Sequence, residues 1–137
     1  MAVHLSHRSE DLRVESAQML IDIARASTIP VVIAGDFNST PPDFPQSSQT
    51  DTGSNAMAEF DASGQFQRLP EANPAEAEFT FHAAKPRSVI DWILIPQNTD
   101  AIKPAWDFRE YRAVDSQSSD HRPVAVSYTH LTLPTKA

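Results

Sequence analysis

The spacing of hydrophobic and polar residues changes along the chain, and each spacing predicts a different element. A short apolar run from Ala2 to Leu5 is typical of the end of a β-strand. From Ser9 onward, apolar residues recur at helical spacing, which predicts an amphipathic helix that Ser9 caps and Pro30 terminates. A wholly apolar run from Val31 to Ala34 then predicts a buried strand that ends at Gly35.

The middle of the chain is polar and has weak periodicity. Residues 40 to 73 are rich in Ser, Thr, Gln, Asp and Pro, which predicts a long surface excursion with one short helix near Ala56 to Ala62. Strand character returns at Phe79 to His82, at Val89 to Ile95 and around Arg122 to Val126. This order of elements predicts a mixed α/β fold with antiparallel pairing toward its end.

The two ends of the chain do not fit a self-contained domain. Residues 127 to 137 resemble translated sequencing-adapter sequence of the kind found at the ends of metagenomic gene fragments. We therefore expect a fold over residues 1 to 126 and a non-native tail after it; a native disordered tail is the alternative. The strand end at residues 2 to 5 has no preceding sequence to pair with, so we expect an upstream segment to be missing.

Composition and charge narrow the function classes. The chain of 137 residues contains no cysteine, which excludes a disulfide framework and a thiolate metal site and favours Mg²⁺ or Mn²⁺ over structural zinc. No run of about 18 consecutive apolar residues occurs, so we expect no transmembrane segment. A net charge of −7 argues against a broad basic surface for duplex nucleic acid. Phosphate-ester hydrolysis stays open, because a bound divalent cation can supply positive charge locally.

Polar or ionisable residues lie at the ends of four apolar runs, where a sheet can hold them around one crevice. The four segments that carry these residues are Val3 to Leu5, Gly35 to Asn38, Ile90 to Ile93 and Ser119 to Pro123. Each run by itself is a weak signal. For Asp36 alone, a turn former or a helix cap is as good an interpretation as a functional carboxylate.

Asp91 is harder to explain structurally, because it lies inside the apolar run from Val89 to Ile95. A buried carboxylate needs a partner. Histidine is the natural one, since a carboxylate that accepts its ring N–H fixes the tautomer and raises the basicity of the imidazole. A structural pairing of Asp91 with an arginine such as Arg87 is the alternative.

In order and spacing, these segments resemble the C-terminal motifs of the endonuclease/exonuclease/phosphatase family, over Ala2 to Val126. The resemblance implies an α/β fold, namely the C-terminal half of a two-sheet α/β sandwich with flanking helices and a mixed sheet. It also implies a missing, required N-terminal half that carries the principal metal-binding Glu. We therefore expect the parent protein to be a metal-dependent phosphoesterase or phosphodiesterase and the fragment alone to be inactive. The alternatives are a non-catalytic truncated fragment and a metal- or anion-binding module.

The resemblance assigns a catalytic dyad and a metal ligand. His121 matches the family's catalytic histidine, which abstracts a proton from the attacking water or stabilises the transition state. Asp91 matches the carboxylate that orients this histidine. Asp120 matches a carboxylate that binds the metal, which we expect to be Mg²⁺ or Mn²⁺.

The resemblance also implies roles for three residues near the start of the chain. Asp36 matches the residue that positions or deprotonates the nucleophilic water, and Asn38 matches an amide that hydrogen-bonds a phosphate oxygen. His4 matches the second histidine, which contacts the scissile phosphate or assists the leaving oxygen. The substrate is a phosphate ester, but the sequence does not decide between a small molecule, a lipid headgroup and a nucleic acid.

Four further residues have structural interpretations. His7 completes an H-x-x-H pattern that we discount as a zinc site, because it lies outside a helix. Arg8 and Arg13 could meet a substrate phosphate, but a helical Arg13 more often forms a surface ion pair with an acid such as Glu10. His82 either reaches the crevice from a strand end or is a satisfied structural histidine.

Overall fold

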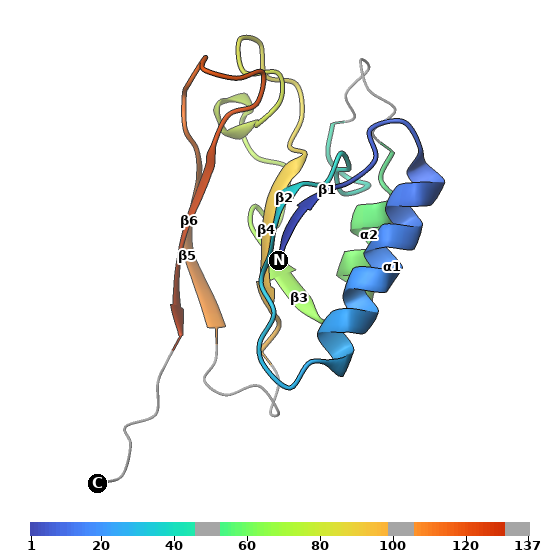
Figure 1. The fold of residues 1–137 in the computed structure, drawn as a ribbon. Coiled ribbons are helices and arrows are strands. Elements are labelled where there is room, and N and C mark those ends of the chain that lie inside the picture. Colours follow the sequence, from blue (N-terminus) through green and yellow to red (C-terminus); the bar gives the residue numbers. More distant parts are fainter. Residues whose placement is uncertain (46–52, 99–105, 131–137) are drawn as a thin grey trace, which may run out of the picture.

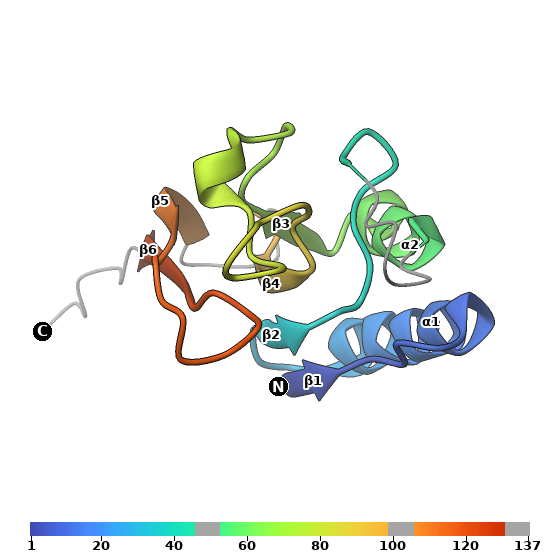
Figure 2. The same ribbon diagram turned by 90° about the horizontal axis from the view of Figure 1, so that it is seen from above.

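The fold has three layers, with a four-stranded sheet between two helices and a two-stranded sheet (Figures 1 and 2). The computed structural model describes residues 1–45, 53–98 and 106–130. The four-stranded sheet has the order β1-β2-β4-β3, and the two-stranded sheet pairs β5 with β6. The strands are β1 (Ala2–His4), β2 (Ile33–Asp36), β3 (Phe66–Arg68), β4 (Asp91–Pro96), β5 (Trp106–Ala113) and β6 (Val124–His130). The helices are α1 (Glu10–Ala26), α2 (Asn55–Ser63) and the 3₁₀ turn η1 (Glu76–Glu78).

Helix α1 forms where local signals place it. The Ser9 side chain accepts a hydrogen bond from the Leu12 amide at 3.2 Å, which satisfies one of the free amides at the helix start. Ala17 and Ile21 are buried on the face that packs toward the sheet. The helix ends at Ala26, a few residues before Pro30, so this sequence prediction is confirmed.

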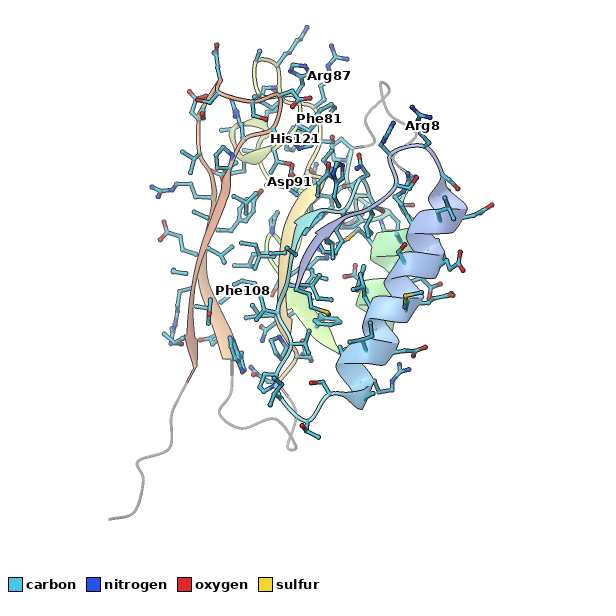
Figure 3. All side chains as sticks on the ribbon, viewed as in Figure 1. Arg8, Phe81, Arg87, Asp91, Phe108 and His121 are labelled. Carbon is cyan, nitrogen blue, oxygen red and sulfur yellow. The ribbon has the colours of Figure 1, made fainter. Side chains whose placement is uncertain are left out.

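One face of the four-stranded sheet packs against the helices. Ile33, Trp92 and Leu94 belong to the same apolar cluster as Met57 and Phe60 of α2, and all are almost fully buried. The β5–β6 sheet lies on the opposite face, where Phe108 of β5 extends between the two sheets (Figure 3). The structure therefore confirms the predicted mixed α/β class with two sheets and flanking helices. Within the described ranges, no helix has the length and apolar character that a membrane crossing requires.

Gly35 allows β1 to approach β2 closely. The two strands are parallel, with Val3 opposite Gly35. A Cβ atom built on Gly35 would lie 2.0 Å from the Val3 carbonyl oxygen, and the φ angle of Gly35 is +146°, a backbone conformation that side chains disfavour. The glycine that ends the apolar run is therefore needed for β1 to take its place in the sheet.

Several predicted elements differ from the structure. The predicted surface excursion over residues 40 to 73 does contain α2, but Thr40 and Phe44 are buried and β3 joins the sheet beside β4. The predicted strand at Phe79 to His82 makes isolated bridges only, because it turns back on itself and Phe81 pairs with Ser88.

The last strand also differs from the one predicted around Arg122 to Val126. Strand β6 continues past Val126 to His130 and pairs with β5, which the sequence did not predict. Residues 127–130 therefore form part of the two-stranded sheet, whereas the rest of the predicted tail, residues 131–137, lies outside the described residues.

Candidate active site

Three neighbouring strands carry an ionisable residue at the same level of the sheet. His4 ends β1 opposite Asp36 of β2, and Asp36 is in turn opposite Asp91 at the start of β4. Because residues directly opposite each other point to the same face, the three side chains form one row across the strands. The sheet register thus brings together residues that are far apart in the sequence.

His121 completes this row from a different part of the chain. It lies in the segment 114–123 that joins β5 to β6, and Figure 3 shows it beside Phe81, above Asp91. Its Nδ1 is 2.9 Å and 3.1 Å from the two carboxylate oxygens of Asp91. The Phe81 ring packs against the imidazole, with the ring centroids 4.9 Å apart. Asp91 is thus paired with a histidine, and Arg87 instead uses its backbone N–H to bind the Phe81 carbonyl oxygen.

The pairing changes the acid–base properties of His121. The hydrogen bond to Asp91 raises the pKa of His121, and the negative charges of Asp91, Asp36 and Asp120 raise it further, whereas partial burial acts in the opposite direction. The carboxylate therefore favours the protonated imidazole. With Nδ1 turned toward Asp91, Nε2 faces Asp36, whose Oδ2 is 3.8 Å away.

Asp36 lies between two imidazoles. Its Oδ2 is 3.5 Å from His4 Nε2 as well as 3.8 Å from His121 Nε2. Burial raises the pKa of Asp36, as does the charge of Asp91; the Asn38 amide, which donates to Asp36 Oδ1 at 2.7 Å, and the two histidines lower it. Asp36 is therefore a partly desolvated carboxylate that accepts a proton more readily than an exposed one.

Asn38 connects the ends of β1 and β2. Its side-chain amide donates to the Leu5 carbonyl oxygen at 3.0 Å, and its φ angle of +45° lies in the left-handed region that asparagine tolerates. Only 4% of its surface is exposed, so it offers little contact area to a ligand in this conformation. Its predicted contact with a phosphate oxygen stays a prediction.

Asp36 and Asp91 form a cluster with His121, whereas Asp120 is exposed and outside it. Ligand atoms of Asp36, Asp91 and His121 all lie within 4.8 Å of one another, and among the described residues this is the group close enough to hold one metal ion. Asp120 is not in this group. It is exposed, its carboxylate accepts from the Ser119 hydroxyl at 3.2 Å, and its carbonyl oxygen accepts from the Ala83 amide at 2.7 Å.

The row opens into a cleft of about 390 Å³ between the two sheets. Its walls come from β2, from β4 and from the segment that leads into β6, and they include Gly35, Ile93 and Val124. Asp36, Asp91 and His121 also line this cleft. A small ligand in this cleft would contact the ionisable cluster directly.

The remaining candidates have structural contacts. The predicted surface position of Arg13 is wrong: Arg13 is buried and donates to the Ser6 carbonyl oxygen at 2.8 Å, while the Glu10 carboxylate accepts from the Asn55 amide. His7 accepts from the Arg8 side chain at 3.1 Å.

The residues around Phe81 include one that the sequence did not single out. The His82 ring packs against Phe81, with the ring centroids 5.4 Å apart. Thr80, the residue before Phe81, is fully buried and its hydroxyl accepts from the Asp91 amide at 3.3 Å. A threonine between two aromatic residues is ordinary strand composition, so only the tertiary contact reveals it.

Comparisons with known proteins agree with this architecture. The model of the endonuclease/exonuclease/phosphatase family matches residues 4–121. No match is found among curated proteins. The fold is similar to the mannosyl-6-phosphatase of Bacteroides thetaiotaomicron, with 21% identity, a TM-score of 0.63 and coverage of 93% of this chain and 49% of that one. It is also similar to the human Nocturnin catalytic domain with bound sulfate, with 16% identity, a TM-score of 0.61 and coverage of 95% and 45%.

A third similar structure is a protein described as a member of the same family, again from Bacteroides thetaiotaomicron. It shares 19% identity and a TM-score of 0.62, and the match covers 93% of this chain and 47% of that one. Identities of this size support the fold and not a particular substrate. The chain spans about half the length of each of these solved structures.

Proposed function

Because the chain belongs to the endonuclease/exonuclease/phosphatase family, we propose that it forms part of a divalent-metal-dependent enzyme that hydrolyses phosphate esters or phosphodiesters. The observation that carries this proposal is the His121–Asp91 pair, whose free imidazole nitrogen faces Asp36 at the edge of the cleft. Phosphoester hydrolysis requires a base for the attacking water and positive charge near the phosphoryl oxygens. The row of side chains supplies groups for both tasks.

The geometry supports different catalytic roles for Asp36 and His121. Asp36 combines a raised pKa with a position between two imidazoles, so we assign it the positioning and deprotonation of water. Asp91 holds Nδ1 of His121 and favours the charged imidazole, so Nε2–H can donate toward an anionic phosphoryl oxygen. His4 flanks Asp36 from the other side, where it can contact the phosphate or the leaving oxygen.

The donor set fits a hard divalent cation. The candidate ligands are carboxylate oxygens, a type of ligand that Mg²⁺ and Mn²⁺ prefer. We propose that Asp120, the residue before His121, binds the ion, and that Asp36, which lines the cleft, is a second candidate ligand. When bound, such an ion would neutralise negative charge on the phosphoryl oxygens and the leaving group, which suits a chain with a net charge of −7.

We also propose that the complete site takes further ligands from an N-terminal half. The observation behind this is coverage, since the chain spans 49% of the mannosyl-6-phosphatase to which it is similar. Two carboxylates form an incomplete shell for an ion that is usually six-coordinate. The second candidate is that the chain, without an N-terminal half, is a non-catalytic fragment. The substrate class, whether small molecule, lipid headgroup or nucleic acid, is left to the assay.

The test is a hydrolysis assay with matched histidine variants. The chain and its full reading frame would be assayed on p-nitrophenyl phosphate and bis-p-nitrophenyl phosphate with Mg²⁺, with Mn²⁺ and with EDTA. We expect metal-dependent turnover that His121→Ala abolishes and His7→Ala preserves, because the His7 side chain is bonded to Arg8 outside the cluster. Turnover by His121→Ala would overturn the proposal. If the full reading frame is active and the 137-residue chain is not, the N-terminal half is needed for activity.

A further inference from the structure

Thr80 is hydrogen-bonded to both of the segments that carry the His121–Asp91 pair. It is fully buried in the segment that follows η1, and it is outside the row of ionisable side chains. Asp91 begins a strand and His121 lies in the connection between β5 and β6, so no regular element holds both. A relative position that is fixed to fractions of an ångström therefore needs a physical link between these segments.

The hydroxyl of Thr80 supplies one end of that link. It accepts hydrogen bonds from the Ile90 amide at 3.1 Å and from the Asp91 amide at 3.3 Å. Among the described strands none pairs with Asp91 on this side, since β3 pairs with β4 from Leu94 to Pro96. On its other side, Asp91 is opposite Asp36, and the hydrogen bond to β2 is made by the preceding residue, whose carbonyl oxygen accepts from the Phe37 amide. Because hydrogen-bonded and non-hydrogen-bonded pairs alternate in an antiparallel ladder, the Asp91 N–H points away from β2. The Thr80 hydroxyl thus accepts the hydrogen bond that the backbone carbonyl of a neighbouring strand would otherwise accept.

The backbone of Thr80 supplies the other end. Its carbonyl oxygen accepts from the amide of Arg122, the residue after His121, at 2.7 Å. Its own amide donates to the Ser88 carbonyl oxygen at 2.9 Å, which anchors Thr80 in the turn. The next residue, Phe81, bridges to His121 through the backbone and packs its ring on the imidazole. One buried residue therefore contacts the segments of both members of the pair.

We infer that Thr80 is a positioning residue that sets the alignment of Asp91 with His121 through its hydroxyl. The inference rests on the proposed catalytic role of that pair. Without the hydroxyl, the Asp91 amide loses the one acceptor that the described residues offer it on the side away from β2. The Asp91 carboxylate can then rotate or shift relative to an imidazole that Phe81 still holds. Small misalignments of a catalytic pair reduce the rate of the chemical step more than substrate binding.

The test compares variants that differ in the hydroxyl alone. Thr80→Val removes the acceptor at nearly constant volume, and Thr80→Ser keeps it. Thr40→Val is the matched control, because Thr40 is equally buried and its hydroxyl has no partner among the described residues. If Thr80→Val does not fold, Thr80→Ser and Thr80→Ala give the same comparison, since both lack the methyl group and differ in the hydroxyl.

The first readout is the NMR signal of the His121 Nδ1–H, assigned in histidine-labelled protein by its absence from His121→Ala. We expect the downfield signal to be lost in Thr80→Val, as in Asp91→Asn, and to be kept in Thr80→Ser and Thr40→Val. The second readout is kinetic: Thr80→Val should lower kcat about tenfold or more with KM nearly unchanged, and Thr80→Ser should restore it.

The two readouts separate this inference from the proposed function. A folded Thr80→Val variant that keeps the Nδ1–H signal would overturn the inference even if the enzyme is active. If the wild-type chain and its full reading frame both fail to hydrolyse phosphate esters, the proposed function fails, but the NMR comparison still decides whether Thr80 aligns the pair.

Discussion

Asp91→Asn is the substitution that addresses the site most directly. It keeps the size of the side chain but removes the charge that His121 Nδ1 contacts at 2.9 Å and 3.1 Å. A hydrogen bond to a charged group contributes about 1.5 to 3 kcal/mol, which corresponds to roughly a 10- to 150-fold change in rate if it acts in the transition state. The side chains of Asp91 and His121 are 18% and 27% exposed, so water screens this contact only in part.

The assay measures kcat/KM on whichever of the two p-nitrophenyl phosphate esters the active protein hydrolyses. Asp22→Asn is the control, because Asp22 forms a surface ion pair with Arg25 on α1 and such pairs contribute little. We expect Asp91→Asn to lose activity within the range above and Asp22→Asn to match the wild type. An Asp91→Asn enzyme within about threefold of the wild type would refute the assignment of Asp91 as the residue that orients His121.

The same variant has a pH signature in stability that does not depend on turnover. Because the hydrogen bond to Asp91 raises the pKa of His121, the folded state binds a proton more tightly than the unfolded state. This stabilisation is complete below the ordinary histidine value of 6.5 and is lost as the pH rises through the higher folded pKa. The difference in unfolding free energy between wild type and Asp91→Asn should therefore be larger in mildly acidic buffer than in alkaline buffer. An equal difference at both would contradict the pairing.

Three other substitutions test the fold and the cluster. Gly35→Ala places a methyl group 2.0 Å from the Val3 carbonyl oxygen, so we expect a loss of about 3 kcal/mol or more in chemical denaturation; an unchanged midpoint would contradict the close approach of β1. Phe60→Ala, at 1% exposure, should cost about 3 to 5 kcal/mol by the same measurement. Asp36→Asn should abolish hydrolysis yet raise the unfolding free energy at neutral pH, because the raised pKa of Asp36 means that the folded state disfavours the charged form above the ordinary value of 3.8.

The parts of the fold that the sequence predicts are those with local signals. Helix α1 follows from Ser9, the periodic apolar positions and Pro30, all within one segment. That a histidine is the natural partner of Asp91 follows from a general requirement, since a carboxylate in an apolar run needs a counterpart, whereas the choice of His121 comes from the resemblance to the family. Neither step needs knowledge of which strands are neighbours.

What the sequence does not reveal depends on contacts between distant segments. Strand β5 carries charged residues at several positions, and a register shift between Phe108 and Glu110 interrupts the alternation of its two faces. Arg13 has the local context of a surface residue, but the chain before α1 folds back and offers the Ser6 carbonyl to it. Thr80 belongs to the same class, because its importance comes from amides and a carbonyl supplied by other segments.

Two different parts of the fold position the members of the cluster, and this predicts how the remaining members respond when one is removed. Sheet register fixes Asp36 opposite Asp91, whereas His121 arrives on a separate connection. In His121→Ala the two carboxylates therefore remain neighbours. Burial and the charge of Asp91 already raise the pKa of Asp36, and His121 is among the groups that lower it. The pKa of Asp36 should rise further in His121→Ala, as measured by NMR titration of the carboxyl carbon, and an unchanged titration would mean that the imidazole exerts no electrostatic effect on Asp36.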